Sequence, residues 1–238
     1  KLQGVKHVDI DIICLKPWMK GKNVWFQATS PDEKSQILKY IGVPEERIFM
    51  LSNVPNVSGN ILPPAYRKKQ EGKLSLVFIS RLQRKKNLVG ALKSLTLVND
   101  RDIEFNIYGP KEVPEYFSEC ERLISELPGN IKAIYHGPAP KEKVPEILRQ
   151  NEVFFLPSFS ENFGHAIVEA MLQYCPVIIS DKTPWTDVNI TGSFALPPDD
   201  YNGFADALRA FCDMGDEEYN KCRYNLYEYV KGKINLDE

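Results

Sequence analysis

Residues 153–180 read VFFLPSFSENFGHAIVEAMLQYCPVIIS and predict two strands that are joined by a loop and a helix. The first run, Val153–Leu156, and the last, Pro176–Ser180, are short, apolar and without period-2 alternation. That pattern is typical of strands buried on both faces of a parallel sheet. Between them, Gly164–Tyr174 has the apolar spacing of a helix. A strand–helix–strand unit crosses over to a parallel neighbour, so this stretch predicts an α/β fold.

The same alternation of strands and helices extends outward in both directions. Further strands are predicted at 24–29, 47–51, 74–80, 103–108, 131–136 and 193–196. Further helices are predicted at 30–41, 87–98, 114–127, 141–149, 201–212 and 216–231. The first of these begins with the Ser-x-x-Glu spacing of a capping box. Repeated β-α units predict a doubly wound, Rossmann-like parallel sheet. Residues 53–64, rich in Pro and Asn, are expected to be a linker, with a domain boundary near residue 60.

The composition is that of an ordinary soluble globular protein. The chain has 238 residues, 43% hydrophobic residues and a formal net charge of −2, so no basic field attracts nucleic acid. No apolar run reaches the roughly 18 residues of a membrane-spanning helix. The five cysteines and three histidines have neither disulfide-framework nor zinc-site spacing, which predicts a cytoplasmic protein with reduced thiols. The chain has no charged-then-apolar leader, so no signal peptide is predicted, and the missing initiator Met predicts a piece of a longer protein.

A basic turn follows the strand predicted at 74–80. Arg81, Arg84, Lys85 and Lys86 come just before a helix start, which offers free N–H groups and a partial positive charge. Ligands of doubly wound sheets bind beyond the carboxyl ends of the strands, so these cations predict a phosphate or diphosphate site. We expect Arg81 and Lys86 to be exposed in the empty cleft. The alternative is a solvated basic turn.

A second candidate site lies between the strand at 153–156 and the helix that follows. Gly164 permits close approach of a ligand to the backbone, and the amides of Asn162 to His165 are placed to hold an anion. Glu161 precedes the helix, and Glu169 lies inside it. A carboxylate facing the interior is costly unless it is paired, and a ligand diol would satisfy Glu169. The alternatives are a helix-surface Glu or one paired with a nearby Lys.

These motifs resemble those of a known family. Residues 161–171, ENFGHAIVEAM, resemble the E-x7-E signature of the retaining GT-B glycosyltransferases of family 4. Residues 80–86 are similar to that family's G-R-L-x-x-x-K phosphate motif, residues 135–137 to its third-strand ending and residues 176–181 to the strand after its E-x7-E helix. The similarity spans roughly residues 24–212. Two departures are Ser80 in place of Gly, and Pro184-Trp185-Thr186 in place of a Gly-rich loop.

The resemblance implies transfer of a sugar from a nucleoside-diphosphate-sugar donor, with retention of anomeric configuration. Arg81 and Lys86 would bind the donor diphosphate, and Glu169 would hold the ribose hydroxyls. Glu161 would be the catalytic residue at the donor sugar. The other donor-binding residues that it implies are Asn162, Phe163, Gly164 and His165 at the sugar and distal phosphate, and Gly137, Pro138 and Ala139 near the base. Fixed cations imply that no cofactor and no divalent metal are required.

The resemblance also divides the chain. Residues 28–53 look like the closing segment of the family's first domain, which binds the acceptor. We therefore expect residues 1–60 to be a remnant of that domain plus linker, and residues 61–238 to be the donor-binding domain with a C-terminal helix. The chain by itself should transfer sugar weakly or not at all. The implied acceptor is a cell-surface glycan or lipid-linked saccharide, as in polysaccharide biosynthesis. The sequence leaves open peripheral membrane association of the full-length protein and a homodimer.

Other functions fit the sequence less well. A glycoside hydrolase needs carboxylates about 5–9.5 Å apart, whereas eight residues of helix separate Glu161 and Glu169 by roughly 12 Å. A metal-dependent GT-A transferase would use the Asp-x-Asp at Asp9 and Asp11, but no GT-A layout surrounds it. An NAD-binding domain needs GxGxxG after a strand, which the sequence lacks. A degenerate domain used only for interaction remains, and nucleotide binding would distinguish it.

Overall fold

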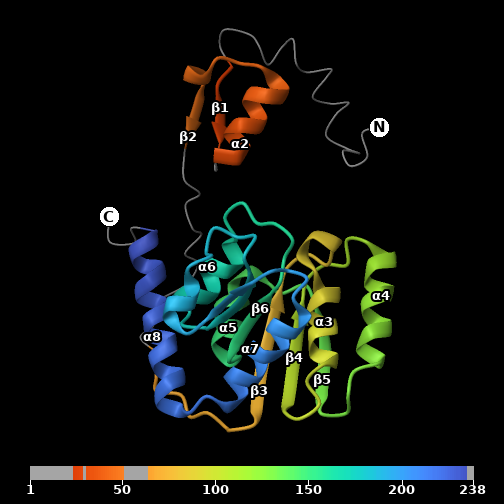
Figure 1. Ribbon diagram of the computed structural model, residues 1–238. Helices are drawn as coiled ribbons and strands as arrows, with labels where there is room; N and C mark the ends of the chain where they lie inside the picture. Colours follow the sequence, from red (N-terminus) through yellow and green to blue (C-terminus); the bar gives the residue numbers. More distant parts are fainter. Residues whose placement is uncertain (1–23, 29–30, 51–63, 235–238) are drawn as a thin grey trace. The chain divides into compact units, whose positions relative to one another are not determined.

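The structure is a computed structural model, and it describes residues 24–28, 31–50 and 64–234 (Figure 1). The chain divides into two compact units, residues 1–54 and 55–238. The predicted boundary near residue 60 and most of the predicted linker fall within 51–63, outside the described residues. Ser30 of the capping box and the Asp9–Asp11 motif lie outside them too. The interpretation of residues 1–60 as an acceptor-domain remnant stays a prediction.

The first unit is small. Strands β1 (Phe26–Ala28) and β2 (Ile48–Met50) form a two-stranded parallel sheet. Helix α2 (Pro31–Gln36) continues as a single π-helical turn over 37–41, so the helix predicted at 30–41 changes its winding in the second half. The turn ends at Gly42, which is left-handed as a helix C-cap commonly is. The described core of this unit consists of Ala28, Ile41, Val43 and Ile48.

The second unit is a doubly wound α/β domain around a six-stranded parallel sheet. Its strands are β3 (Lys73–Ile79), β4 (Asp102–Tyr108), β5 (Ile131–Gly137), β6 (Val153–Leu156), β7 (Val177–Ser180) and β8 (Phe194–Leu196). Their order in the sheet is β5-β4-β3-β6-β7-β8. The first strand therefore lies at the centre, and the strand order reverses between β3 and β6. The predicted doubly wound, Rossmann-like sheet is confirmed, and the strand order, which the sequence did not predict, is the Rossmann order with its switch point at that pair.

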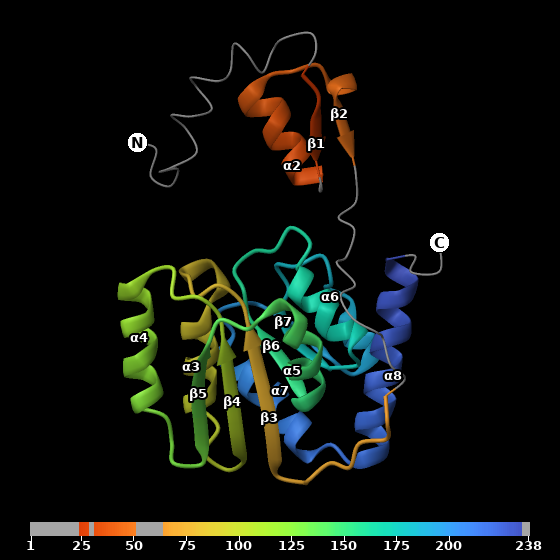
Figure 2. The ribbon, with the colours of Figure 1, turned by 180° about the vertical axis from the view of Figure 1, so that it is seen from behind.

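Helices cover both faces of this sheet. They are α3 (Leu88–Thr96), α4 (Pro114–Ser125), α5 (Val144–Gln150), α6 (His165–Leu172), α7 (Tyr201–Asp213) and α8 (Asp216–Lys233). Helices α3, α4 and α7 lie on one face, and α5, α6 and α8 lie on the other (Figures 1 and 2). Figure 2 shows no helix in front of β4 and β5, and there the strands carry polar side chains such as Glu104 and Lys132.

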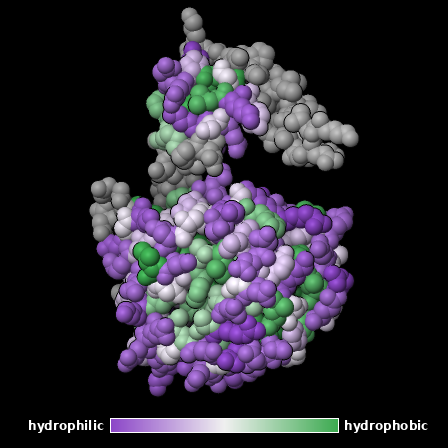
Figure 3. All heavy atoms as spheres, viewed as in Figure 1, coloured by the Kyte–Doolittle hydropathy of each residue, from purple (hydrophilic) through white to green (hydrophobic). Residues whose placement is uncertain are grey.

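The core follows the apolar runs seen in the sequence. Every residue of β6 and β7 is buried, as expected for central strands with helices on both faces. On the visible face of this unit, hydrophilic side chains cover most of the surface and apolar ones occupy smaller areas (Figure 3). None of the helices in the described part of the chain has the length and apolar character to cross a membrane.

The cysteines of the second unit belong to this core. Cys120, Cys175, Cys212 and Cys222 are buried free thiols, while Cys14 lies outside the described residues. Burial raises the pKa of all four thiols to about 12. They are therefore protonated at neutral pH and act as small apolar side chains rather than as nucleophiles.

Candidate functional site

The switch point brings two loops side by side at the carboxyl edge of the sheet. One is the basic turn after β3, which contains a 3-10 turn over Arg84–Lys86, and the other is the loop 157–164 after β6. The backbone N–H of Phe159 donates to the carbonyl of Lys85 at 2.8 Å. The two segments that the sequence singled out separately therefore form one surface.

Asn87 fastens these loops together. It is left-handed (φ 56°) and caps α3, accepting a hydrogen bond from the N–H of Gly90 at 3.0 Å. Its amide nitrogen donates to the carbonyls of Pro157 and Pro198, both at 2.9 Å. The sequence offered only the signal of an Asn at a helix start, which predicts the cap. The bonds to the turns after β6 and β8 join distant residues and could not be predicted from it.

Lys86 and Glu161 form an ion pair between these two loops. Lys86 Nζ lies 2.6 Å from Glu161 Oε1, and the two side chains are only 15% and 9% exposed. The expectation that Lys86 is exposed is therefore wrong, because a buried carboxylate is costly without a partner and Lys86 provides one. The backbone N–H of Glu161 donates to the carbonyl of Lys182 at 2.9 Å. Both charges are thus held at the switch point.

The other cations of the basic turn lie at its rim. Arg81 is exposed as expected, at 60% of its side chain, and its Nη1 lies 3.4 Å from Glu112 Oε1. Arg84 points toward α4, with Nη1 3.3 Å from Glu119 Oε2, and is 72% exposed. Pairs this exposed contribute little to stability. Arg81 therefore remains exposed at the rim of the basic turn, whereas the side chain of Arg84 is directed toward α4 and away from the Lys86–Glu161 pair.

The start of α6 offers backbone N–H groups at the same edge of the sheet. Gly164 precedes the helix in the left-handed region (φ 78°), and a Cβ there would lie 2.9 Å from the Ile167 side chain. The N–H groups of Ile167 and Val168 both donate to the carbonyl of Gly164. Within the described ranges, no acceptor is bonded to the N–H groups of His165 and Ala166. These free donors and the positive end of the helix favour an anion.

Glu169 lies inside α6, half-buried. Burial raises the pKa of its carboxyl group, and the charge of Lys141 opposes that effect. Across the described residues, the structure gives its carboxylate neither a hydrogen bond nor an ion pair. The alternative of a paired surface Glu therefore does not describe this side chain. A partly buried carboxylate without a partner, with a raised pKa, is a candidate binding group.

The predicted base-binding residues lie further along the sheet. Gly137 ends β5 in the left-handed region (φ 79°), and its carbonyl accepts the N–H of Gly109 at 2.9 Å. A Cβ at Gly109 would lie 1.8 Å from the carbonyl oxygen of Ser80, so the ends of β3 and β4 pack tightly. Pro138 and Ala139 follow directly after β5. That strand is separated from β3 by β4, which puts these residues apart from the Lys86–Glu161 pair.

Comparison with known proteins decides the family. The model of the family described as glycosyl transferases group 1 matches residues 64–229, which include the whole six-stranded sheet. The chain belongs to the glycosyl transferases group 1 family.

Individual relatives are distant. The D-inositol 3-phosphate glycosyltransferase of Arthrobacter sp. (strain FB24) is 25% identical over 199 residues, which cover 78% of this chain and 47% of the relative. A probable sucrose-phosphate synthase of Thermosipho melanesiensis is 25% identical, with coverage of 96% and 57%. The chain thus spans about half the length of the curated relatives that it matches.

Solved structures share the fold. Anabaena Alr3699/HepE, crystallised in complex with UDP and glucose, has a TM-score of 0.73 at 15% identity, covering 97% of this chain and 66% of that one. A glycosyltransferase from Rickettsia africae has a TM-score of 0.72 at 17% identity, covering 99% and 66%. At these identities the likeness shows the fold, a Rossmann-like parallel sheet of the GT-B glycosyltransferases.

Two features of this group 1 domain went unnoticed in the sequence. Trp185, buried in the loop after β7, donates its indole N–H to the carbonyl of Phe163 at 2.6 Å. The sequence marked residues 184–186 only as a departure from the family pattern. Ser158, also buried, keeps a hydroxyl without a partner among the described residues, while its carbonyl accepts from Ser180. Both contacts depend on folding and have no local signal.

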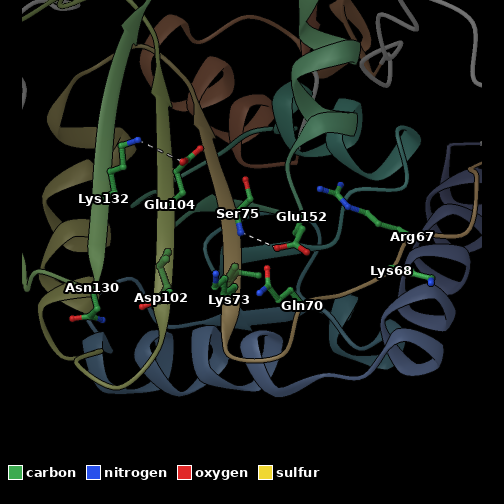
Figure 4. Close-up of a pocket in the computed structure, with 12 residues that line it drawn as sticks. Arg67, Lys68, Gln70, Lys73, Ser75, Asp102, Glu104, Asn130, Lys132 and Glu152 are labelled. Atoms are coloured by element: carbon green, nitrogen blue, oxygen red, sulfur yellow. Dashed lines mark hydrogen bonds and ion pairs between the residues drawn. The ribbon is translucent and has the colours of Figure 1, made fainter.

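A cavity lies at the opposite edge of the same sheet. Its volume is about 490 Å³, and it is lined by residues at the amino ends of β3 to β6 (Figure 4). None of the predicted site residues lines it. The carboxylate of Glu152, which lines it, already has partners: it accepts the N–H of Ser75 at 2.8 Å and lies 3.7 Å from the ammonium of the nearby Lys69. Because ligands of doubly wound sheets bind at the carboxyl edge, the region around Lys86 and Glu161 is the candidate site of this transferase domain.

Proposed function

We propose that this chain binds a nucleoside-diphosphate sugar at the switch point and forms the donor half of a retaining glycosyltransferase. The observation that carries the proposal is the Lys86–Glu161 pair beside the free N–H groups of α6. The family membership supplies the reaction class. The motifs at 80–86 and 161–169 supply the resemblance to retaining family 4 transferases.

The pair suggests how the empty site changes when the donor arrives. Lys86 Nζ now satisfies the carboxylate of Glu161, and a diphosphate would compete for that ammonium. When Lys86 turns to the phosphate, the Glu161 carboxylate becomes free to accept hydrogen bonds from the hydroxyls of the donor sugar. In the empty site each side chain therefore serves as the partner of the other. A donor would replace both contacts, with its diphosphate binding Lys86 and its sugar hydroxyls binding Glu161.

The same cations would stabilise the leaving group. As the bond between sugar and diphosphate breaks, negative charge grows on the phosphate oxygens. Lys86, Arg81 and the N–H groups at the start of α6 are fixed donors for that charge, and each preorganised donor contributes about 2.7–4 kcal/mol in a water-excluded site. We propose that these fixed donors replace a divalent metal, so donor binding should survive a chelator.

Glu169 would hold the ribose. A carboxylate accepts two hydroxyl hydrogen bonds, and a ribose diol presents two hydroxyls side by side. Such a ligand would give the half-buried carboxylate of Glu169 the partners that it lacks among the described residues. Binding would then offset the cost of burying that charge.

The acceptor is proposed to bind mainly outside this chain. The relatives are about twice as long, and their names refer to compounds as different as D-inositol 3-phosphate and sucrose phosphate. We therefore propose a common donor site, with the acceptor chosen by the rest of the full-length protein. A glycan or lipid-linked saccharide is the acceptor class that we favour.

The test is titration calorimetry of the chain with UDP, GDP, ADP and their sugars. We expect one base to bind, and Lys86→Ala and Arg81→Ala each to weaken that binding by about 1.5–3 kcal/mol, the scale of charge-assisted hydrogen bonds. Lys85→Ala is the matched control, because Lys85 is an exposed cation of the same turn. It should bind as the wild type does.

Two results would count against the proposal. Equal losses in all three variants would indicate a general charge effect rather than a site. If the wild-type chain binds no nucleotide at all, the second candidate function is favoured: a degenerate transferase domain that serves in protein interaction.

A further inference from the structure

The loop after β7 contains a side chain that the family pattern does not predict. Trp185 stands where that pattern has a Gly-rich loop, and it is the only Trp of residues 55–238. It is 4% exposed. Its backbone N–H donates to Thr183 Oγ1 at 3.2 Å, and its indole N–H donates to the carbonyl of Phe163 at 2.6 Å. The ring is therefore fixed at both ends.

That carbonyl belongs to the peptide bond between Phe163 and Gly164. The carbonyl and the N–H of one trans peptide point in opposite directions, because the peptide group is planar. Holding the Phe163 carbonyl on the indole therefore fixes the direction of the Gly164 N–H on the other side of the chain. Gly164 is left-handed and has no Cβ, so without that bond this peptide would have wide freedom to rotate.

The C-terminal helix supports the Trp from behind. Tyr229 of α8 packs its ring edge-on against Trp185, with centroids 6.3 Å apart. Its hydroxyl donates to Asp187, which lies in the same loop as Trp185. Lys233 Nζ donates to the other carboxylate oxygen of Asp187 at 2.8 Å. The loop after β7 is thereby tied to a long helix rather than left free to move.

We propose that Trp185 is a positioning residue for donor binding: it holds the turn 162–165 so that the backbone N–H groups before α6 face the diphosphate. The inference rests on the proposed function and adds a group that touches no ligand. A glycine in its place could neither donate a side-chain hydrogen bond nor pack against Phe163, whose ring lies 5.7 Å from the indole.

The decisive variant is Trp185→Phe, which keeps an aromatic ring but removes the N–H donor. We expect the affinity for the nucleoside diphosphate that the wild type binds to fall about 5–20-fold, as for one lost hydrogen bond. Amide hydrogen exchange of residues 158–165 in the empty protein should become faster. Exchange in β4 and β5 should not change, which separates positioning from general loosening.

Tyr229→Phe is the matched control. It removes the hydroxyl bond to Asp187 but keeps the ring and the indole donor, so affinity should stay within about two-fold of the wild type. If Trp185→Phe does not fold, the wild-type indole N–H resonance provides the measurement. It should be protected from exchange with water, whereas that of Trp25, which is 56% exposed, should not be. Rapid exchange at Trp185 would overturn the inference.

The outcomes separate the two proposals. If the wild type binds a nucleoside diphosphate and Trp185→Phe binds it equally well, the positioning role is wrong and the proposed function stands. If the wild type binds no nucleotide, the proposed function fails. The role in donor binding then falls with it, and unchanged exchange at 158–165 in Trp185→Phe would additionally show that the indole does not hold the turn.

Discussion

The two edges of the six-stranded sheet differ in how their polar groups are satisfied. At the amino edge, around the cavity of about 490 Å³, Arg67 donates three hydrogen bonds to the carbonyls that end α5, and Lys69 pairs with Glu152. At the carboxyl edge, the carboxylate of Glu169 and the N–H groups of His165 and Ala166 have no partner in the described structure. The cavity therefore lies at the edge where these groups already bond to one another, and the presence of a cavity alone does not identify the site.

The difference also appears in the buried charges. Burial lowers the pKa of Lys69, and Glu152 acts in the opposite direction by favouring the charged form. Burial raises the pKa of Glu169, and only the more distant charge of Lys141 opposes it. A buried charge with a fixed partner, such as Lys69, contributes to the stability of the folded domain. A buried charge without such a partner, such as Glu169, is available to bind a ligand. Substitutions at the two edges should accordingly have opposite effects on stability and on binding.

The largest expected effect is at the amino edge. Glu152→Ala removes the acceptor of the Ser75 N–H and leaves Lys69, whose side chain is 1% exposed, without its ionic partner. We expect the free energy of unfolding to fall by about 3–5 kcal/mol, as when one partner of a buried pair is deleted. Urea denaturation measures this. Nucleotide affinity of the folded fraction should be unchanged.

Lys132→Ala serves as the control for that substitution. Lys132 also lines the cavity, but it is 72% exposed and lies 3.9 Å from Glu104. Its loss should change stability by no more than about 0.5 kcal/mol. If Glu152→Ala weakened nucleotide binding with little loss of stability, the assignment of a structural role to the amino edge would be wrong. The cavity at that edge would then be the better candidate for the nucleotide site.

Much of this fold could be predicted from the sequence because the signals are local. The central strands β6 and β7 are continuous apolar runs, and the observed Val153–Leu156 and Val177–Ser180 differ from the predicted runs by at most one residue. The helix after β6 follows apolar spacing in the same way, with α6 at His165–Leu172 inside the predicted 164–174. The repeated strand–helix alternation then allows few topologies, of which the observed strand order is one.

The contacts that build the site could not be predicted, because they join distant residues. Lys86 and Glu161 are 75 positions apart, and Trp185 and Phe163 are 22 apart. The sequence placed a cation and a carboxylate at two strand ends, but their pairing depends on β3 and β6 being neighbours. The network of Arg67 at the amino edge lacks a motif as well, since its acceptors are backbone carbonyls.

The second prediction concerns Glu169. A folded-state pKa above the unfolded value means that the native protein holds this proton more tightly, so stability falls as pH rises through the range between the two values. Glu169→Gln removes that loss. We expect the empty variant to match the wild type at low pH and to be more stable than the wild type at pH 7, while its nucleotide affinity falls.

Urea denaturation between about pH 4 and pH 8 measures the stability difference, and calorimetry measures the affinity. Glu71→Gln is the control, since Glu71 is an exposed carboxylate in the turn before β3. It should show neither effect. A Glu169→Gln variant that loses stability while binding nucleotide normally would mean that this carboxylate serves the fold, as Glu152 does.

The smallest expected effect tests whether Arg81 belongs to the site at all. Glu112 lies 3.4 Å from Arg81 Nη1, and both side chains are well exposed, so this pair is worth only a few tenths of a kcal/mol. A diphosphate bound by Arg81 must compete with that carboxylate. Glu112→Gln should therefore raise the affinity for the nucleoside diphosphate about two-fold in dilute salt. The gain should shrink toward zero near 1 M salt, where the screening length falls to about 3 Å.

Glu119→Gln provides the matched comparison, because it releases Arg84, whose partner on α4 holds it away from the Lys86–Glu161 pair. Both substitutions change the net charge by the same amount, so a long-range effect would raise affinity equally in the two variants. A gain confined to Glu112→Gln would show that Arg81 binds the ligand directly, whereas equal gains would leave Lys86 and the start of α6 as the donors that contact the diphosphate.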